Sequence, residues 1–294
     1  MEITLLGTGT PTPSLKRMSS GYIVTAGADT LLFDHGPGAH HRMLESGRKA
    51  VDVTHLFFSH LHYDHCLDYA RLVLTRWDQG ADQIPDLKVY GPDYTARMSE
   101  LMFSKDGAFS PDLTARTEYP GSLAVYEARG GKLPRPWPAP EVQEFRSGDV
   151  ITGNGWTVTV QSVVHQQPYI QCFGFRLETP EGSFVYSGDC GPCKGMERLA
   201  RDCDVLVHMC HYISGTALNA GMQKGSSGHM EIADLAAKAN VRTLVVSHVT
   251  EQMDVPGVRE RLLQEIGRVY SGNVIWGEDL MRIPLRGPEP RKLL

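Results

Sequence analysis

Long apolar runs are missing from this chain of 294 residues. No uninterrupted apolar stretch approaches the roughly 20 residues that a membrane-spanning helix needs. The first residues, MEITLLGTGT, also lack the basic segment followed by an apolar one that marks a secretory signal peptide. We therefore expect a cytoplasmic protein that has no membrane partner.

An excess of positive charge is missing as well. The chain has 29 Lys and Arg residues against 34 Asp and Glu residues, which gives a net charge of −5. Such a chain offers no overall attraction to a polyanion, although a local basic patch could exist. The charge therefore makes nucleic acid an unlikely partner.

Cysteine is scarce, with six residues, and without a secretory signal this favours reduced thiols over a disulfide framework. Cys190-Gly-Pro-Cys193 has the spacing of a thioredoxin-type redox pair. It does not open a thioredoxin-like helix, however, but follows a candidate metal ligand. We interpret it as a Gly-Pro turn with packed thiols, and redox catalysis is the minor alternative.

What is present is a series of short apolar, β-branched runs separated by turn signals, with helical periodicity between some of them. Two β-rich halves with intervening helices predict two packed sheets covered by helices, an α/β fold in a single domain over residues 1–294. In the helix predicted at 66–77, the apolar side chains are Leu67, Ala70, Leu74 and Trp77. The predicted strands lie at 2–9, 21–27, 30–36, 53–60, 87–92, 156–165, 172–179, 183–190, 204–210, 242–248 and 273–279, and the other helices at 196–203, 229–240 and 256–270.

Residues 101–144 break this rhythm, because Pro and Gly concentrate around Trp137. Proline removes backbone donors and glycine loosens the chain, so we expect a long irregular insertion here. It could be a lid that adds Trp137 to a substrate pocket, or else a surface connection or dimer contact, which leaves a homodimer open. Residues 286–294 are expected to form a short tail.

The segment His60-Leu-His62-Tyr-Asp64-His65 places four metal-ligand side chains in six positions, directly after an apolar run. This spacing predicts a metal site. Further ligands should then follow other strands, since a metal centre needs side chains from several backbone segments. Candidates stand at the ends of three apolar runs, where a strand would anchor them: His165, Asp189 and His248.

With these motifs the sequence resembles the metallo-β-lactamase superfamily, and within it the ribonuclease Z and arylsulfatase-like branch. The similarity runs through LLGTGTPTP, LLFDHGPG, SHLHYDH, VVHQQP, YSGDC and GHMEIADLAAKANVRTLVVSH. It implies an αββα sandwich and two metal ions, zinc by default, although manganese, iron or cobalt would also suit these ligands. The ligands implied are His60, His62 and His165 for one ion, Asp64, His65 and His248 for the second, and Asp189 as the bridge.

The resemblance implies hydrolysis, because two cations lower the pKa of a bridging water until it becomes a hydroxide nucleophile near neutral pH. Asp64 and His229 are the predicted catalytic residues, the second as a proton donor to the leaving group. Asp34 matches a family position that orients a metal ligand. His211 is a further candidate beside the metals, although a structural role for it is about as well supported.

Two departures from ribonuclease Z sequences bear on the substrate. Met209 stands where those proteins carry a glutamate that pairs with a histidine, here His229. The segment between His165 and Asp189 is also too short for the tRNA-clamping arm, and is long enough only for a hairpin.

We therefore expect a dinuclear metal hydrolase for a small ester-like, sulfate, phosphodiester or activated aromatic substrate. Its pocket wall would come from Met209, Tyr169 and Trp137. The first alternative is a tRNA 3′-processing endoribonuclease, and the second is a non-catalytic or redox-linked metal protein.

Overall fold

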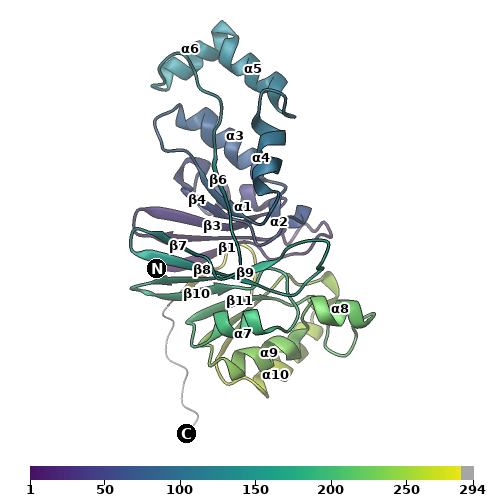
Figure 1. Cartoon of the computed structure of the whole chain (residues 1–294). Coiled ribbons are helices and arrows are strands. Elements are labelled where there is room, and N and C mark those ends of the chain that lie inside the picture. The colour runs from purple at the N-terminus through teal and green to yellow at the C-terminus, as the bar shows by residue number, and fades with distance from the viewer. Residues whose placement is uncertain (286–294) are drawn as a thin grey trace.

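The computed structural model describes residues 1–285, and the predicted tail at 286–294 lies outside them. Within this range the strands form two seven-stranded sheets that face each other (Figure 1). The first sheet has the order β14 (Arg282–Pro284), β1 (Glu2–Gly7), β2 (Gly21–Ala26), β3 (Asp29–His35), β4 (His55–Phe57), β5 (Lys88–Gly91) and β6 (Glu141–Glu144). The second has the order β13 (Asn273–Trp276), β12 (Thr243–Ser247), β11 (Val205–Met209), β10 (Gly182–Tyr186), β9 (Phe173–Thr179), β8 (Trp156–Ser162) and β7 (Val150–Gly153).

The main core fills the space between the sheets. Phe33 and Phe57 of the first sheet pack against Phe175 of the second, with ring centroids 5.7 and 5.9 Å from it. All three side chains are fully buried. Edge-to-face and tilted pairs of this kind add to the stabilisation that burial of the rings provides.

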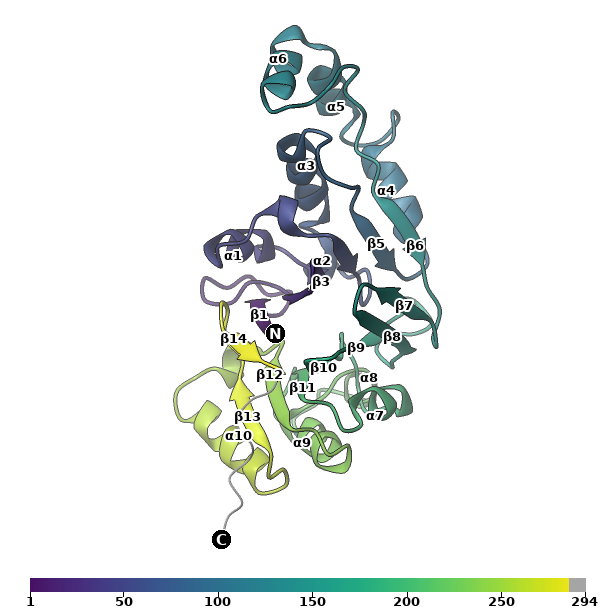
Figure 2. The ribbon, with the colours of Figure 1, turned by 90° about the vertical axis from the view of Figure 1, so that its left-hand side faces the viewer.

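Helices cover the outer face of each sheet, which gives the four layers of an αββα sandwich and confirms the predicted fold class (Figures 1 and 2). No helix among residues 1–285 is long and apolar enough to cross a bilayer. On the first sheet lie α1 (Ala39–Glu45), α2 (Tyr63–Cys66), α3 (Tyr69–Gly80) and α4 (Thr95–Phe103), with a 3₁₀ turn at Ala50–Asp52. On the second lie α7 (Lys194–Ala200), α9 (His229–Lys238) and α10 (Val258–Gly267), with a 3₁₀ turn at Glu251–Met253, and α8 (Ala220–Gly225) lies beside this layer.

The helix predicted at 66–77 exists, but its buried face differs from the predicted one. α3 buries Tyr69, Leu72, Val73 and Arg76, whereas Leu67 is exposed. Arg76 can be buried because its Nε donates to the carbonyl of Val53, 2.8 Å away. A guanidinium with a partner therefore occupies a core position that apolar periodicity does not reveal.

The insertion is irregular mainly at residues 129–140, around Trp137, which corrects the prediction for the rest of residues 101–144. It contains the end of α4, then α5 (Ser110–Glu118) and α6 (Pro120–Ala128), which project away from the sandwich (Figures 1 and 2). The prolines were misleading because Pro111 and Pro120 lie in the first turns of α5 and α6. A proline at that position lacks only an N–H that has no partner within the helix.

Candidate functional site

The predicted ligands converge at one edge of the sandwich, where several strands end. Segments after β4, β8, β10 and β12 carry them, and α2 adds two more. Strand ends hold these short segments firmly, because the preceding residues are fixed in the sheet. The side chains form two clusters, and within each cluster the ligand atoms lie within 4.8 Å of one another. The first consists of His60, His62, His165 and Asp189, and the second of Asp64, His65 and His248.

Asp189 lies between the clusters. Its Oδ1 is 3.4 Å from Nε2 of His65, and its Oδ2 is 3.4 Å from Nε2 of His248 and 3.8 Å from Nε2 of His165. One carboxylate thus faces histidines of both groups. In the second cluster, Oδ2 of Asp64 lies 3.4 Å from Nε2 of His65 and 3.3 Å from Nε2 of His248.

The polar atoms of this site fit divalent cations. Among the described residues, buried atoms without a hydrogen-bond partner include Nε2 of His65, Nε2 of His165 and Oδ1 of Asp189. A buried polar atom without a partner is costly, and a metal ion would complete its coordination. Imidazole nitrogens with carboxylate oxygens are a donor set that zinc and related ions accept.

The charges of the site are strongly coupled. Burial alone would raise the pKa of Asp189, but His248 and His65 hold it well below its usual range. Burial would likewise lower the pKa of His65, whereas Asp189 and Asp34 raise it well above the ordinary value. The carboxylates therefore stay ionised and supply negative charge for cations.

Asp34 holds the ring of His65 from behind. Its Oδ2 accepts a hydrogen bond from Nδ1 of His65 at 2.7 Å and another from the hydroxyl of Tyr186 at 2.6 Å. Ser59 donates its backbone N–H and its hydroxyl to the same carboxylate. Because Nδ1 is engaged in this way, Nε2 of His65 faces the other ligand side chains. Sequence reasoning missed Ser59 and Tyr186, although each is close to a predicted ligand in the chain.

A cleft of about 950 Å³ opens over the two clusters. Met209 and Tyr169, two of the predicted pocket residues, line it together with His211. Tyr169 is 92% exposed, so its ring stands at the rim. Lys224 of α8 is the one Lys or Arg side chain among the described residues that line the cleft, and no sequence motif pointed to it.

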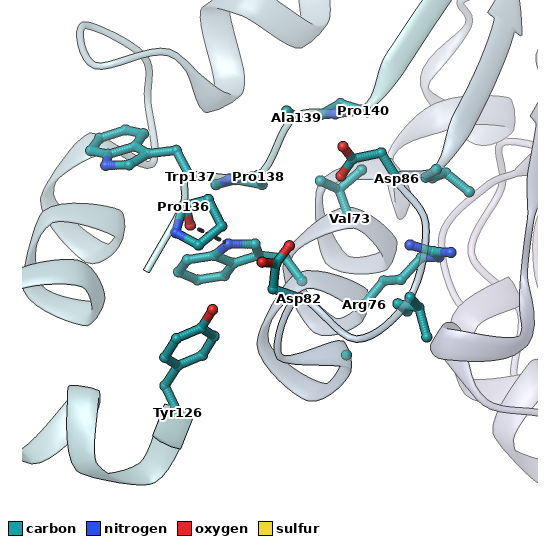
Figure 3. Close-up of a pocket in the computed structure, with 14 residues that line it drawn as sticks. Val73, Arg76, Asp82, Asp86, Tyr126, Pro136, Trp137, Pro138, Ala139 and Pro140 are labelled. Carbon is teal, nitrogen blue, oxygen red and sulfur yellow. Dashed lines mark hydrogen bonds between the residues drawn. The ribbon is translucent and has the colours of Figure 1, made fainter. Parts of the chain in front are cut away.

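Trp137 does not belong to this cleft, which corrects the third predicted pocket residue. It lines a separate pocket of about 110 Å³ between α3 and the segment that follows α6 (Figure 3). There the indole of Trp77 donates to the carbonyl of Pro136 at 2.8 Å, and the Arg135 guanidinium lies 3.8 Å from the centre of the Trp77 ring. Arg135 and Pro136, the neighbours of Trp137, thus join the segment after α6 to α3.

His229 is also displaced from its predicted place. It begins α9, is buried, and does not line the cleft. Its Nε2 lies 2.7 Å from Oε2 of Glu265 in α10, and its Nδ1 accepts the backbone N–H of Ser214 at 3.1 Å. Both ring nitrogens are therefore engaged within the protein. His211, in contrast, has a buried Nδ1 without a partner among the described residues, and its ring centroid is 5.5 Å from that of His248.

Comparison with known proteins identifies the relatives of this chain. The family described as Beta-lactamase superfamily domain matches residues 29–249. Proteins named Ribonuclease Z from Mycolicibacterium paratuberculosis and Mycobacterium bovis are 32% and 31% identical, over 98% and 96% of this chain and 99% and 98% of their own. Among solved structures, the metallo-beta-lactamase fold protein YhfI from Bacillus subtilis has a TM-score of 0.73 at 19% identity, covering 96% of this chain and 98% of its own. The short form of human tRNase Z (ELAC1) has a TM-score of 0.68 at 21% identity, covering 97% and 100%.

These relatives overturn the predicted substrate class. A small-molecule substrate and an unlikely nucleic-acid partner were expected from the net charge, from Met209 and from the short segment before Asp189. Similarity to proteins named Ribonuclease Z along nearly the whole chain outweighs these local departures, and both expectations are wrong. The expectation of a metal-dependent hydrolase is confirmed, and the chain belongs to the ribonuclease Z branch of the metallo-β-lactamase superfamily.

Proposed function

We propose that this protein is a zinc-dependent endoribonuclease that cleaves precursor tRNA at the 3′ end of the tRNA body. One observation carries the proposal, namely the similarity to proteins named Ribonuclease Z over 98% of the chain. The two ligand clusters beneath an open cleft support it, because a phosphodiester in that cleft would lie next to both.

In this proposal His60, His62 and His165 of the first cluster would hold one zinc ion. Asp64, His65 and His248 would hold the second, and Asp189 would contribute to both sites. Bound zinc would supply an activated water and would polarise the phosphodiester. Asp34 fixes the ring of His65, since its carboxylate accepts the Nδ1 proton.

Residues at the walls of the cleft would position the RNA. Lys224 offers an ammonium to a phosphate oxygen, and the exposed ring of Tyr169 offers a face on which an unpaired base can stack. His211 faces the same space and is our candidate to give a proton to the leaving oxygen. It replaces His229, whose two ring nitrogens are engaged by Glu265 and Ser214.

The tRNA would be held without the arm expected of this branch. The segment between His165 and Asp189 consists of a loop and the β9–β10 hairpin, as its length predicted. We therefore place binding of the 3′ region on the rim of the cleft, around Tyr169 and Lys224.

The test is cleavage of a precursor tRNA that carries a 3′ trailer, with the product end mapped to the nucleotide. We expect zinc-dependent cleavage at the 3′ boundary of the tRNA body, abolished by a chelator and by Asp189→Asn. The same RNA without the trailer should stay intact. A folded, zinc-loaded protein that leaves the precursor uncut, or cuts it only at scattered positions, would rule the proposal out.

A further inference from the structure

Two cysteines of the turn after β10 lie side by side behind the metal cleft. Cys190 is completely buried, and its Sγ is 3.6 Å from Nε2 of His208. Cys193 is partly exposed and directly precedes α7. The two side chains are close enough for the Cys190 thiol to lower the pKa of Cys193, while Cys193 and burial raise the pKa of Cys190. The turn therefore holds one accessible and one buried sulfur close together.

Cys193 opens onto a cavity that is distinct from the metal cleft. This cavity has a volume of about 450 Å³ and lies between α7 and α9. Most charged side chains that line it form ion pairs of opposite sign, since Lys194 pairs with Glu197 at 2.8 Å and Lys238 with Asp234 at 3.6 Å. A small neutral reagent can therefore reach Cys193 without passing through a strong electrostatic field.

Cys193 differs from the other cysteines in its chemistry. The thiol of Cys190 lowers the pKa of Cys193 to about 6 despite burial, and the backbone N–H groups of Met196, Val164 and Gly195 contribute. Burial instead raises the pKa of Cys66, Cys172 and Cys203 to about 12, and it raises that of Cys210 as well. The thiolate is the reactive form of cysteine, so Cys193 stands out among the six.

We propose that Cys193 is a peroxide-reactive modification site and that Cys190 converts the oxidised form to an intrachain disulfide. The Cys193 thiolate attacks one oxygen of a hydroperoxide, the O–O bond breaks, and a sulfenic acid forms as hydroxide leaves and takes up a proton. The sulfur of Cys190 then attacks the sulfenic sulfur, the S–S bond forms and water leaves. Two thiols are oxidised by two electrons in all, and one hydroperoxide is reduced.

The site does not depend on the proposed nuclease activity. It uses neither the cleft nor any predicted metal ligand as a reactant, although Cys190 directly follows Asp189. The backbone around the pair is firmly held, since the carbonyl of Cys190 accepts the hydroxyl of Ser227 at 2.9 Å and the N–H of Gly191 donates to Val164 at 2.8 Å. The disulfide therefore has to form by side-chain movement within a fixed turn.

The test uses the full zinc-loaded chain, a small excess of hydrogen peroxide, alkylation of the remaining thiols and mass mapping of the fragments. We expect the fragment with Cys190 and Cys193 to lose two hydrogens, while Cys66, Cys172, Cys203 and Cys210 become alkylated only after denaturation. In Cys190→Ser, oxidation should stop at a sulfenic acid that dimedone captures on Cys193. In Cys193→Ser, thiol oxidation should be at least about tenfold slower.

The matched control is Cys172→Ser, which removes a buried thiol and should oxidise like the unaltered chain. Two outcomes would overturn the proposal: an unaltered chain whose Cys190 and Cys193 are both alkylated after peroxide treatment, or a Cys193→Ser chain that oxidises as fast as the unaltered one. The first outcome needs no variant, so it decides the question even if a substitution impairs folding.

Discussion

Nδ1 of His65 lies 2.7 Å from Oδ2 of Asp34, and both side chains are fully buried. Asp34 adopts a left-handed backbone conformation with a φ of 56°, which is uncommon for a residue with a side chain. The carboxylate that fixes the His65 ring therefore belongs to a residue with an uncommon backbone conformation. The prediction that Asp34 orients a metal ligand can be tested directly.

We predict that Asp34→Ala weakens the binding of the second metal ion by about 10–100-fold, because the ring of His65 loses the partner that fixes its orientation. Metal titration by calorimetry would measure the change. Tyr186→Phe is the control, since it removes one hydrogen bond to Asp34 and keeps the bond to His65. It should have a much smaller effect, and equal losses in the two variants would argue against the orienting role.

The shared position of Asp189 predicts a difference in metal stoichiometry between two variants. The unaltered protein should bind close to two zinc ions per chain, because seven ligands surround two sites. Asp189→Ala should disturb both ions, whereas His62→Ala should mainly weaken one. Elemental analysis of purified protein would measure this, and unchanged metal content in a folded Asp189→Ala protein would refute the assignment.

His211 and His229 should respond differently to substitution. His211→Ala should lower kcat for precursor tRNA by roughly 100-fold or more with little change in bound metal, as expected for a lost proton donor. His229→Ala should instead lower the free energy of unfolding by about 1–3 kcal/mol, because Glu265 loses a buried partner. Single-turnover kinetics and denaturant unfolding would separate the two effects. The reverse pattern would return the catalytic role to His229.

Tyr169 should contribute to RNA binding and not to the chemical step. Base stacking on an aromatic side chain is worth about 1–3 kcal/mol, so Tyr169→Ala should raise KM for precursor tRNA by roughly 5- to 100-fold and leave kcat nearly unchanged. Trp137→Ala is a suitable control, because Trp137 lines the separate pocket beside α3. A larger effect on KM from Trp137 than from Tyr169 would contradict our placement of the RNA.

Stability should fall in mild acid because of a buried histidine pair. Nε2 of His35 lies 3.2 Å from Nδ1 of His40, and burial, with Arg71 and His41, lowers the pKa of His40 to about 4. Below about pH 6.5 the unfolded chain binds a proton that the folded chain does not, so folding loses stability as the pH falls toward 4.

Because of His40, the free energy of unfolding should fall by about 2 kcal/mol between pH 6.5 and pH 5. His40→Gln should flatten the pH dependence of the free energy of unfolding, measured with denaturant across this range. His41→Gln, which changes an exposed neighbour with the smallest of the three influences on the pKa of His40, should alter this dependence far less. An unaltered slope in His40→Gln would show that other groups govern the acid response.

Strands and ligands could be read from the sequence because both are encoded locally. A buried strand needs a continuous apolar run, and a ligand at its end needs only the right residue type at the next position. His60, His165, Asp189 and His248 follow such runs, and each of their segments reaches the same edge of the sandwich. The helices α5 and α6 were missed, because a proline is informative only once its position within the helix is known.

The sequence by itself determined the strands of the two sheets except β6, β7 and β14, together with the ligand types and their places at strand ends, since these depend on residues that are adjacent in the chain. Only the tertiary structure decided which way the other functional side chains point. The ring of His229 contacts Glu265 of α10, Trp137 lines a separate pocket beside α3, and Arg76 is buried where it donates to the carbonyl of Val53. Each of these outcomes depends on a residue that is distant in sequence. The packing of whole helices and strands brings such residues together, and local sequence patterns do not encode that packing.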